Sequence, residues 1–351
     1  MSFFQDVVKA MKDDSTTLAE DGLSAAQFNG FIDTGCYMLN AVLSGSLYGG
    51  IPNNKITGFG GDPSTGKTFF ALGIVSKFLS SNPEAGVVYY DTESAVTKDM
   101  MVSHGIDTSR VIIAEPVTIQ EFRTHTLEVL RQYNELPVSK RPPMLFVLDS
   151  LGQLSTSKEL EDTQEGKDTR DMTKAQVIKA TFRVLTLKLA QLKVPMLVTN
   201  HVYTVVGSYV PAKAMSGGSG LLYAASSIAM LSKKKDRVGT DVVGNIVVVK
   251  MDKSRLSKEN SQVELKLSYT KGLDKYFGLL DLAEKYSVFK KVATRYELPN
   301  GEKVFGKTIN ENPTKYYTPE IMELLDAAAK SEFSYGGESI VTKDDATTEE
   351  D

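Results

Sequence analysis

The sequence predicts an α/β protein built on a mostly parallel, twisted sheet. From residue 31 to about residue 270, apolar β-like runs alternate with helix-like runs, as in doubly wound sheets. A glycine-rich loop separates the first of these runs from a helix-like stretch at residues 69–79. The last three runs have little helix between them, which predicts antiparallel strands at that edge. The β-like runs span residues 55–60, 86–90, 111–114, 144–148, 194–200, 227–231, 246–251 and 263–269.

Smaller elements flank this core. Apolar residues at helical spacing behind Ser2, with Gln5 as its capping-box partner, predict a short N-terminal amphipathic helix. Such a helix is not stable alone, so we expect it to pack on the core or on a neighbouring subunit. After Gly272, helix-like stretches at 279–286 and 319–330 flank a turn that ends at Gly301, which predicts a small C-terminal α+β domain. We therefore expect an N-terminal helix and oligomerisation segment at 1–30, the core at 31–271, the small domain at 272–330 and a disordered acidic tail at 331–351.

The composition favours a cytoplasmic protein. Hydrophobic residues make up 41% and charged residues 24% of the 351 residues. No run reaches the roughly 18 apolar residues of a membrane span. The first residues lack a basic region followed by a cleavable apolar one, so we expect no secretory signal. The single Cys36 cannot form an internal disulfide, and we expect it to be buried, as suits a reducing compartment.

The net charge is uneven along the chain. Residues 338–351 carry six acidic side chains and one lysine, a net charge of −5, so the whole-chain charge of −4 leaves +1 on residues 1–337. Residues 232–258 carry eight Lys or Arg and three Asp, a local charge of +5. Such a patch suits polyphosphate or nucleic acid, although a solvated strand rim gives the same pattern.

Residues 61–68 read GDPSTGKT, a complete G-x-x-x-x-G-K-[ST] phosphate-binding loop (P-loop). Its glycines let backbone N–H groups turn toward phosphates, and the N-terminus of the following helix adds positive potential. We expect Lys67 to reach the β- and γ-phosphates and Thr68 to offer its hydroxyl to Mg²⁺. A turn that only caps a helix is the alternative, but the β-like run before it and the helix after it favour binding of ATP or GTP. The expected phosphate-binding residues are Gly61, Asp62, Pro63, Ser64, Thr65, Gly66, Lys67, Thr68 and Phe69.

Acidic residues follow two further β-like runs. Asp149 ends the run at 144–148, the arrangement in which a carboxylate holds Mg²⁺ or its water. Asp91 and Glu93 follow the run at 86–90, at the carboxyl edge where α/β sheets build their sites. We choose Glu93 as the general base that activates water, because hydrolysis needs a carboxylate separate from the one that holds the metal. A helix N-cap is the alternative role for either acid.

A long irregular stretch follows the run at 194–200. Residues 202–220 contain four glycines and no regular pattern, which indicates a functional or disordered loop. His201 lies at its base and can donate a hydrogen bond to a γ-phosphate, so we expect the loop to respond to the nucleotide. A purely structural histidine at a strand end is the alternative.

In their order, these motifs resemble the RecA recombinase family, and within it the recombinases of tailed phages. The resemblance spans roughly residues 30–290. The P-loop is shared by many families, but the ordered set is specific. The motifs are GDPSTGKT, Asp91-Thr-Glu93, Leu148-Asp149-Ser150, Asp171-Met-Thr-Lys174, Asn200-His201 before a Gly-Gly loop, Asp252-Lys-Ser-Arg255 and Gly278-Leu-Leu-Asp281-Leu.

The resemblance implies a RecA-type, DNA-dependent ATPase that uses ATP and Mg²⁺ and forms a helical filament on single-stranded DNA. The filament would pair that strand with homologous double-stranded DNA and exchange strands. By the same resemblance Glu93 is the catalytic glutamate, His201 senses the nucleotide, and Lys253 and Arg255 reach into the ATP of the neighbouring subunit. Residues 161–171 and 202–220 match the two DNA-binding loops, which contact DNA largely through backbone amides and phosphates. The candidate DNA-binding residues are Lys167, Arg170, Lys174, Tyr203, Lys213, Gly217 and Gly218.

The resemblance also implies single-strand-binding and mediator proteins as partners, no membrane, and a phage protein acting in the cytoplasm of its bacterial host. Two other readings of the core stay open. A RecA-fold helicase motor usually needs a further assembly domain, for which the first 30 residues leave no room. A P-loop kinase that does not act on DNA would use the Gly-Gly loop as a lid over its acceptor. A non-catalytic ATP-binding filament protein is a further alternative.

Overall fold

The computed structural model describes residues 3–11, 16–18, 20, 30–167, 171–204 and 213–336. The chain divides into two compact units. The first comprises Met1–Phe31, Pro52–Gly60 and Ala71–Ser226, and the second comprises Ile32–Ile51, Gly61–Phe70 and Ser227–Asp351. The P-loop therefore belongs to the second unit, whereas the strands that carry the acidic residues belong to the first.

The first unit contains the parallel part of the sheet, in the order β3-β7-β6-β4-β5. Neighbouring pairs among β4, β5, β6 and β7 run parallel, and Asp91 lies opposite Asp149 in the register of β4 and β6. The interiors of β4 and β6 are buried, which accounts for their unbroken apolar runs. The bounds are β3 Ile56–Gly61, β4 Gly86–Asp91, β5 Val111–Ala114, β6 Met144–Asp149 and β7 Met196–Thr204.

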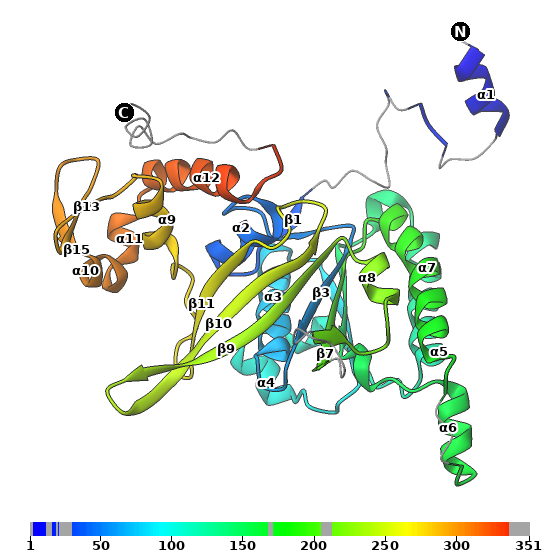
Figure 1. Cartoon of the computed structure of the whole chain (residues 1–351). Coiled ribbons are helices and arrows are strands. Elements are labelled where there is room, and N and C mark those ends of the chain that lie inside the picture. Colours follow the sequence, from blue (N-terminus) through cyan, green and yellow to red (C-terminus); the bar gives the residue numbers. More distant parts are fainter. Residues whose placement is uncertain are drawn as a thin grey trace, which may run out of the picture. The chain divides into compact units, whose positions relative to one another are not determined.

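Helices α5 (Ile119–Glu135) and α7 (Lys174–Leu192) lie side by side in this unit (Figure 1). α5 begins with a capping box in which Thr118 and Glu121 bond to each other's backbone. α7 buries a stripe made of Ile178, Phe182, Leu185 and Leu189. This stripe packs the helix against the rest of its unit.

The second unit contains the antiparallel strands, in the order β12-β11-β10-β9. A long hairpin joins β9 (Ser227–Val238) to β10 (Asp241–Ser254), and β11 (Gln262–Ser268) and β12 (Gly272–Leu273) follow it. Helix α2 (Tyr37–Ser44) packs on β10 and β11 and buries Cys36 at its N-cap, as expected. Burial raises the pKa of the Cys36 thiol to about 11, so the side chain stays neutral.

The C-terminal part of the second unit combines a small antiparallel sheet with helices, as the sequence predicts. Gly301 N–H donates to Leu298 C=O at 2.8 Å and closes the turn between β14 and β15. Gly301 has φ +83°, a conformation that glycine adopts at no steric cost. The bounds are α9 Leu279–Lys285, β13 Lys290–Val292, β14 Arg295–Glu297, β15 Lys303–Phe305, α10 Gly306–Glu311, α11 Pro313–Tyr316 and α12 Pro319–Phe333.

The remaining described elements are short apart from α3. They are α1 Phe3–Met11, β1 Phe31–Ile32, β2 Ile51–Pro52, α3 Lys67–Ser81, α4 Lys98–Ser103, α6 Ser157–Gln164, β8 Lys213–Met215 and α8 Gly220–Ala224. The α1 helix matches the expected amphipathic helix, while its proposed cap Ser2 lies outside the described residues. Within the described part of the chain, no helix has the length and apolar character needed to cross a bilayer.

The α/β class, the parallel core and the antiparallel edge are confirmed, but three segments differ from expectation. The stretch at 202–220 is not wholly irregular, because Val202, Tyr203 and Thr204, with strong β-propensity, pair with β8. The expected loop at 161–171 begins later, since a capping box of Thr156 and Glu159 carries α6 on to Gln164. At the C-terminus, α12 runs past Ser331 to the buried Phe333, and residues 337–351 lie outside the described part.

Candidate functional site

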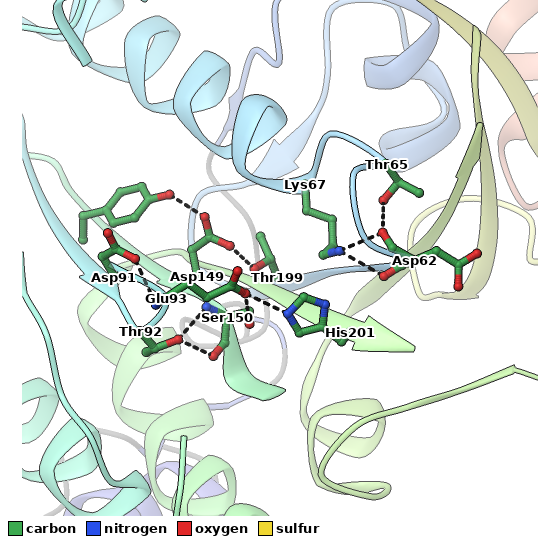
Figure 2. Close-up of polar contacts among 12 residues, drawn as sticks. Asp62, Thr65, Lys67, Asp91, Thr92, Glu93, Asp149, Ser150, Thr199 and His201 are labelled. Carbon is green, nitrogen blue, oxygen red and sulfur yellow. Dashed lines mark hydrogen bonds and ion pairs between the residues drawn. The ribbon is translucent and has the colours of Figure 1, made fainter. Parts of the chain in front are cut away.

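The P-loop folds around its own lysine. The Lys67 ammonium donates to Gly61 C=O at 3.0 Å and to Asp62 C=O at 3.1 Å, and its side chain is buried (Figure 2). The Thr65 hydroxyl also donates to Asp62 C=O, at 2.9 Å. These bonds hold the loop closed and leave Thr68 at the N-terminal turn of α3, where backbone N–H groups attract anions.

Two glycines of the P-loop are required by its geometry. Gly66 has φ +94°, which side-chain-bearing residues rarely adopt. At Gly61, a Cβ atom would lie 2.7 Å from Thr65 Oγ1 and 2.9 Å from Leu231 C=O, so the loop has no room for one. The structure therefore explains why the first and sixth positions of the G-x-x-x-x-G-K-[ST] pattern hold glycine here: Gly66 for its φ and Gly61 for the lack of space.

In the first unit, Asp149 is held rigidly at the end of β6. Its carboxylate accepts a hydrogen bond from the Tyr89 hydroxyl at 2.8 Å and another from the Thr199 hydroxyl (Figure 2). Burial, and then the charge of Asp149, raise the pKa of Tyr89, so its phenol stays a neutral donor. The sequence did not indicate either partner, although both lie on strands adjacent to β6.

The two acids that follow β4 have different environments. Asp91 is buried and accepts from the backbone N–H groups of Glu93 at 3.1 Å and Val96 at 2.8 Å, so it organises its own loop. Glu93 instead turns toward other strand ends. Its Oε1 accepts from Ser150 Oγ and from His201 Nε2, both at 2.7 Å (Figure 2). Of the two acids, Glu93 is the one whose carboxylate is oriented by side chains, as a catalytic base is.

The loops that carry Glu93 and Ser150 are tied together. Thr92 Oγ1 accepts from Ser150 N–H and donates to Ser150 C=O, both at 2.8 Å. The peptide bond between Asp149 and Ser150 is cis. Through its hydroxyl, Ser150, which the sequence indicated only as part of a motif, contacts the Glu93 carboxylate from the neighbouring strand β6.

His201 connects this cluster to the segment that follows β7. Its C=O accepts from Ser216 N–H at 2.9 Å, and Asn200 Nδ2 donates to Ser216 C=O at 2.8 Å. Gly152 packs against the same residues, since a Cβ there would lie 3.1 Å from Asn200 Oδ1 and 3.3 Å from the His201 ring. The His201 backbone and the Asn200 side chain thus hold Ser216, the residue that precedes the Gly217-Gly218 turn.

The candidate DNA-contacting glycines pack closely on α7. Gly217 and Gly218 have φ +80° and +76°, and Cβ atoms there would lie 2.5 Å from Ile178 Cδ1 and 3.1 Å from Ala175 Cβ. Neither position has room for a side chain, so each offers only backbone groups to a phosphate.

The other candidate DNA-binding residues are spread over the same unit. Lys174 forms an ion pair with Glu159 at 3.3 Å, and Lys167 forms one with Glu165. Tyr203 is 54% exposed on β7, and Lys213 is exposed at the start of β8. Arg170 lies outside the described residues.

Lys253 and Arg255 lie in the second unit, at and just after the end of β10. Lys253 is half-buried and Arg255 is exposed. Burial, and then the Arg255 charge, lower the pKa of Lys253. The Glu259 carboxylate, which accepts from Ser254 N–H at 3.3 Å, raises that pKa in turn, so the two cations share this turn with one acid.

The basic segment at 232–258 forms most of the β9–β10 hairpin, and part of its charge is balanced within the sheet. Lys234 pairs with Glu264 at 2.6 Å and Asp236 with Lys266 at 3.0 Å. Because alternate residues of a strand point to opposite faces, Lys233, Lys235 and Arg237 project from the other face. One face of β9 therefore carries ion pairs, and the other face carries three positive side chains.

The donor chemistry of Asp149 at the end of β6 fits magnesium. Mg²⁺ prefers oxygen ligands and usually keeps several waters beside one or two carboxylates and the substrate phosphates. Each oxygen of Asp149 accepts one hydrogen bond from Tyr89 or Thr199, and a carboxylate has about four acceptor positions. Asp149 therefore keeps capacity for a metal-bound water. In the second unit, the Thr68 hydroxyl offers an oxygen ligand of the same kind.

Known proteins of one family are similar to this chain over the residues that carry the P-loop, Asp149, Glu93 and His201. Residues 16–274 match the RecA N-terminal domain family. The recombination and repair protein of Enterobacteria phage T4, UvsX, is 30% identical over 273 residues, which are 77% of this chain and 68% of that protein. Protein RecA of Deinococcus radiodurans is 28% identical over 268 residues, 76% of this chain and 70% of RecA. A solved structure of the RadB recombinase is 21% identical with a TM-score of 0.49, covering 69% of this chain and 98% of that one.

Proposed function

The chain belongs to the RecA family, and from that premise we propose that it is an ATP-driven recombinase. It forms a helical filament on single-stranded DNA, pairs that strand with a homologous duplex and exchanges strands. The observation that carries the proposal is the Glu93 cluster, in which Ser150 and His201 orient one carboxylate at the end of β4. The bond between His201 and Ser216 joins this cluster to a candidate DNA-binding segment.

Each part of the site has a distinct role in ATP hydrolysis. The P-loop N–H groups and Lys67 bind the phosphates, whose charged oxygens are stronger acceptors than the two carbonyls that Lys67 now contacts. Thr68 and Asp149 would hold Mg²⁺ or its water, and a bound Mg²⁺ would neutralise charge on the phosphates. Glu93 takes a proton from the attacking water. His201 responds to the γ-phosphate, because the Nε2 proton that it donates to Glu93 can also be donated to a phosphate oxygen.

DNA stimulates ATP hydrolysis by bringing subunits together in the filament. Lys253 and Arg255 approach the ATP of the neighbouring subunit when subunits stack on DNA, so turnover becomes DNA-dependent. The segments at 161–171 and 202–220 contact the DNA, through Lys167, Arg170, Lys174, Tyr203, Lys213, Gly217 and Gly218. The core at 31–271 carries out ATP hydrolysis and binds DNA. The segment at 1–30 joins subunits, and residues 272–330 form a small additional domain. Single-strand-binding and mediator proteins assist filament loading in the cytoplasm of a phage-infected bacterium.

Electron microscopy tests the proposal directly. The protein is imaged with a non-hydrolysable ATP analogue, with and without single-stranded DNA. Regular helical filaments that require the DNA support a recombinase. Closed rings would favour a helicase motor, and ATP turnover indifferent to DNA, without filaments, would favour a P-loop kinase.

Removing the acidic tail is expected to strengthen DNA binding. Truncation after Gly336 deletes residues that carry −5 and leaves α12 and Tyr335 in place. Because a tethered polyanion competes with DNA for the same cations, the affinity for single-stranded DNA should rise, and its dependence on salt and Mg²⁺ should weaken. Titrations of labelled single-stranded DNA at several salt concentrations measure both.

A full-length control replaces the six acids of residues 338–351 with Asn or Gln. It should behave like the truncated protein if charge is the cause. Identical salt titrations for the truncated, neutralised and native proteins would show that the tail has no part in DNA binding.

A further inference from the structure

The turn after β10 is built around two buried serines. The Ser254 hydroxyl accepts from Leu256 N–H at 3.2 Å and Ser257 N–H at 2.9 Å. The Ser257 hydroxyl donates to Val42 C=O of α2 at 2.6 Å. These bonds lie on either side of Arg255, so the backbone that carries this cation is fixed at both ends.

The end of helix α12 holds the same turn. The Lys258 ammonium donates to Ser331 C=O at 2.8 Å and Glu332 C=O at 2.9 Å, and Lys258 N–H donates to Phe333 C=O at 2.6 Å. These carbonyls belong to the last turn of α12, where unpaired acceptors and the helix dipole favour a cation. A β-bridge between Ser257 and Ser334 extends the contact. Lys258 therefore caps a helix more than 70 residues away in sequence.

Tyr335, just beyond α12, contacts the peptide group that leads into Arg255. Its hydroxyl donates to Ser254 C=O at 3.3 Å and accepts from Glu259 N–H at 3.4 Å. Both bonds are long, so each is weak alone. The Tyr335 bonds hold the start of the turn at Ser254, and the Lys258 bonds hold its end, so both ends of the turn are attached to the C-terminal end of α12.

The helix is in turn anchored away from the turn. Asp326 is buried and accepts from Ser46 Oγ at 2.7 Å and Leu47 N–H at 2.8 Å, after α2, and Figure 1 shows α12 beside α2. The turn after β10 and helix α12 are thus both bonded to α2 or to the residues that follow it. An external support matters because a cation that acts across a subunit interface must already be in position.

We propose that the end of α12 positions Lys253 and Arg255, through Lys258 and Tyr335, for action on the ATP of a neighbouring subunit. Lys258 and Tyr335 are positioning residues, since their contacts are with the backbone of the turn and the helix. This inference rests on the proposed trans-acting role of the pair. It makes the C-terminal helix a part of the DNA-dependent ATPase, beyond its place in a peripheral domain.

The test uses full-length Lys258→Met and Tyr335→Phe proteins. Methionine keeps an apolar stem of similar length and removes the ammonium. Lys258→Met should lose about 10- to 100-fold in DNA-stimulated kcat, since small misplacements of a charge have effects of that size. Tyr335→Phe should lose less, because the two bonds that it removes are long. Turnover without DNA and single-stranded DNA binding should be unchanged. Lys258→Arg should restore the stimulated rate, because a guanidinium can still donate to both carbonyls.

A matched control is Lys285→Met, because Lys285 contacts the Glu332 carboxylate at 2.6 Å and not the turn. It should keep the stimulated rate. Mixing Lys258→Met with a Lys67→Ala protein should recover DNA-dependent turnover, since the second protein supplies a correctly placed pair.

Native DNA-stimulated rates in Lys258→Met and Tyr335→Phe, beside a Lys253→Ala/Arg255→Ala protein that lacks DNA stimulation, would overturn the positioning role and leave the proposed function intact. Native rates in that double variant would overturn the proposed function itself. Equal losses with and without DNA in both single variants, together with a lower Tm, would also overturn the inference, because they indicate a general role in folding.

Discussion

Replacing Glu93 by Gln is expected to slow ATP hydrolysis about 10²- to 10⁴-fold, the usual contribution of a general base. Glutamine cannot take a proton but can still accept from Ser150 and His201 through its amide oxygen, so the cluster should keep its shape. ATP binding should survive, and complexes with DNA should last longer because ATP is retained. Steady-state turnover and the dissociation rate of labelled single-stranded DNA measure the two effects.

Two controls identify the step that is lost. Lys67→Ala should lose turnover because phosphate binding fails, so a fluorescent ATP analogue should bind to Glu93→Gln and not to Lys67→Ala. Asp91→Asn tests the choice between the acids. Since Asp91 accepts from the backbone N–H groups of Glu93 and Val96, its loss should lower Tm along with turnover. Hydrolysis by Glu93→Gln at a near-native rate would contradict the assignment of the base.

The sequence predicted the elements that local pattern determines. Unbroken apolar runs such as 144–148 are required where both faces of a strand are buried, so the parallel strands were found to within a few residues. The P-loop was found because its glycines meet strict local demands, visible at Gly61 and Gly66. The acids at the strand ends followed from the rule that parallel strands present their carboxyl ends at one edge.

The features that the sequence did not predict depend on contacts between residues that are distant in sequence. Tyr89 was part of an apolar run, and only the register of neighbouring strands brings its hydroxyl to Asp149. Lys258 belonged to a basic segment, and nothing local indicated that its ammonium caps α12. The hairpin at Val202–Thr204 was missed because the glycines beyond it dominated the pattern. In each case a tertiary contact determines what the side chain does.

Replacing Lys253 and Arg255 together by Ala is expected to abolish the DNA-stimulated part of ATP hydrolysis. A cation supplied by a neighbouring subunit stabilises charge in the transition state and contributes about 10³- to 10⁵-fold in related phosphoryl-transfer sites. The pair is expected to act only between subunits stacked on DNA, so turnover without DNA and ATP binding by the monomer should survive. ATPase assays over a range of DNA concentrations, with filament formation followed by microscopy, measure the loss.

Mixing experiments decide whether the pair acts on a neighbour. The double variant keeps an intact P-loop, and a Lys67→Ala protein keeps an intact pair. In a mixed filament, some P-loops of the first protein face Lys253 and Arg255 of the second, so DNA-dependent turnover should return and pass through a maximum as the ratio changes. If mixed filaments form but turnover stays absent at every ratio, the pair acts within its own subunit or on DNA phosphates. A Lys250→Ala protein is a suitable control, because Lys250 lies on the same strand and lacks the position at the end of β10.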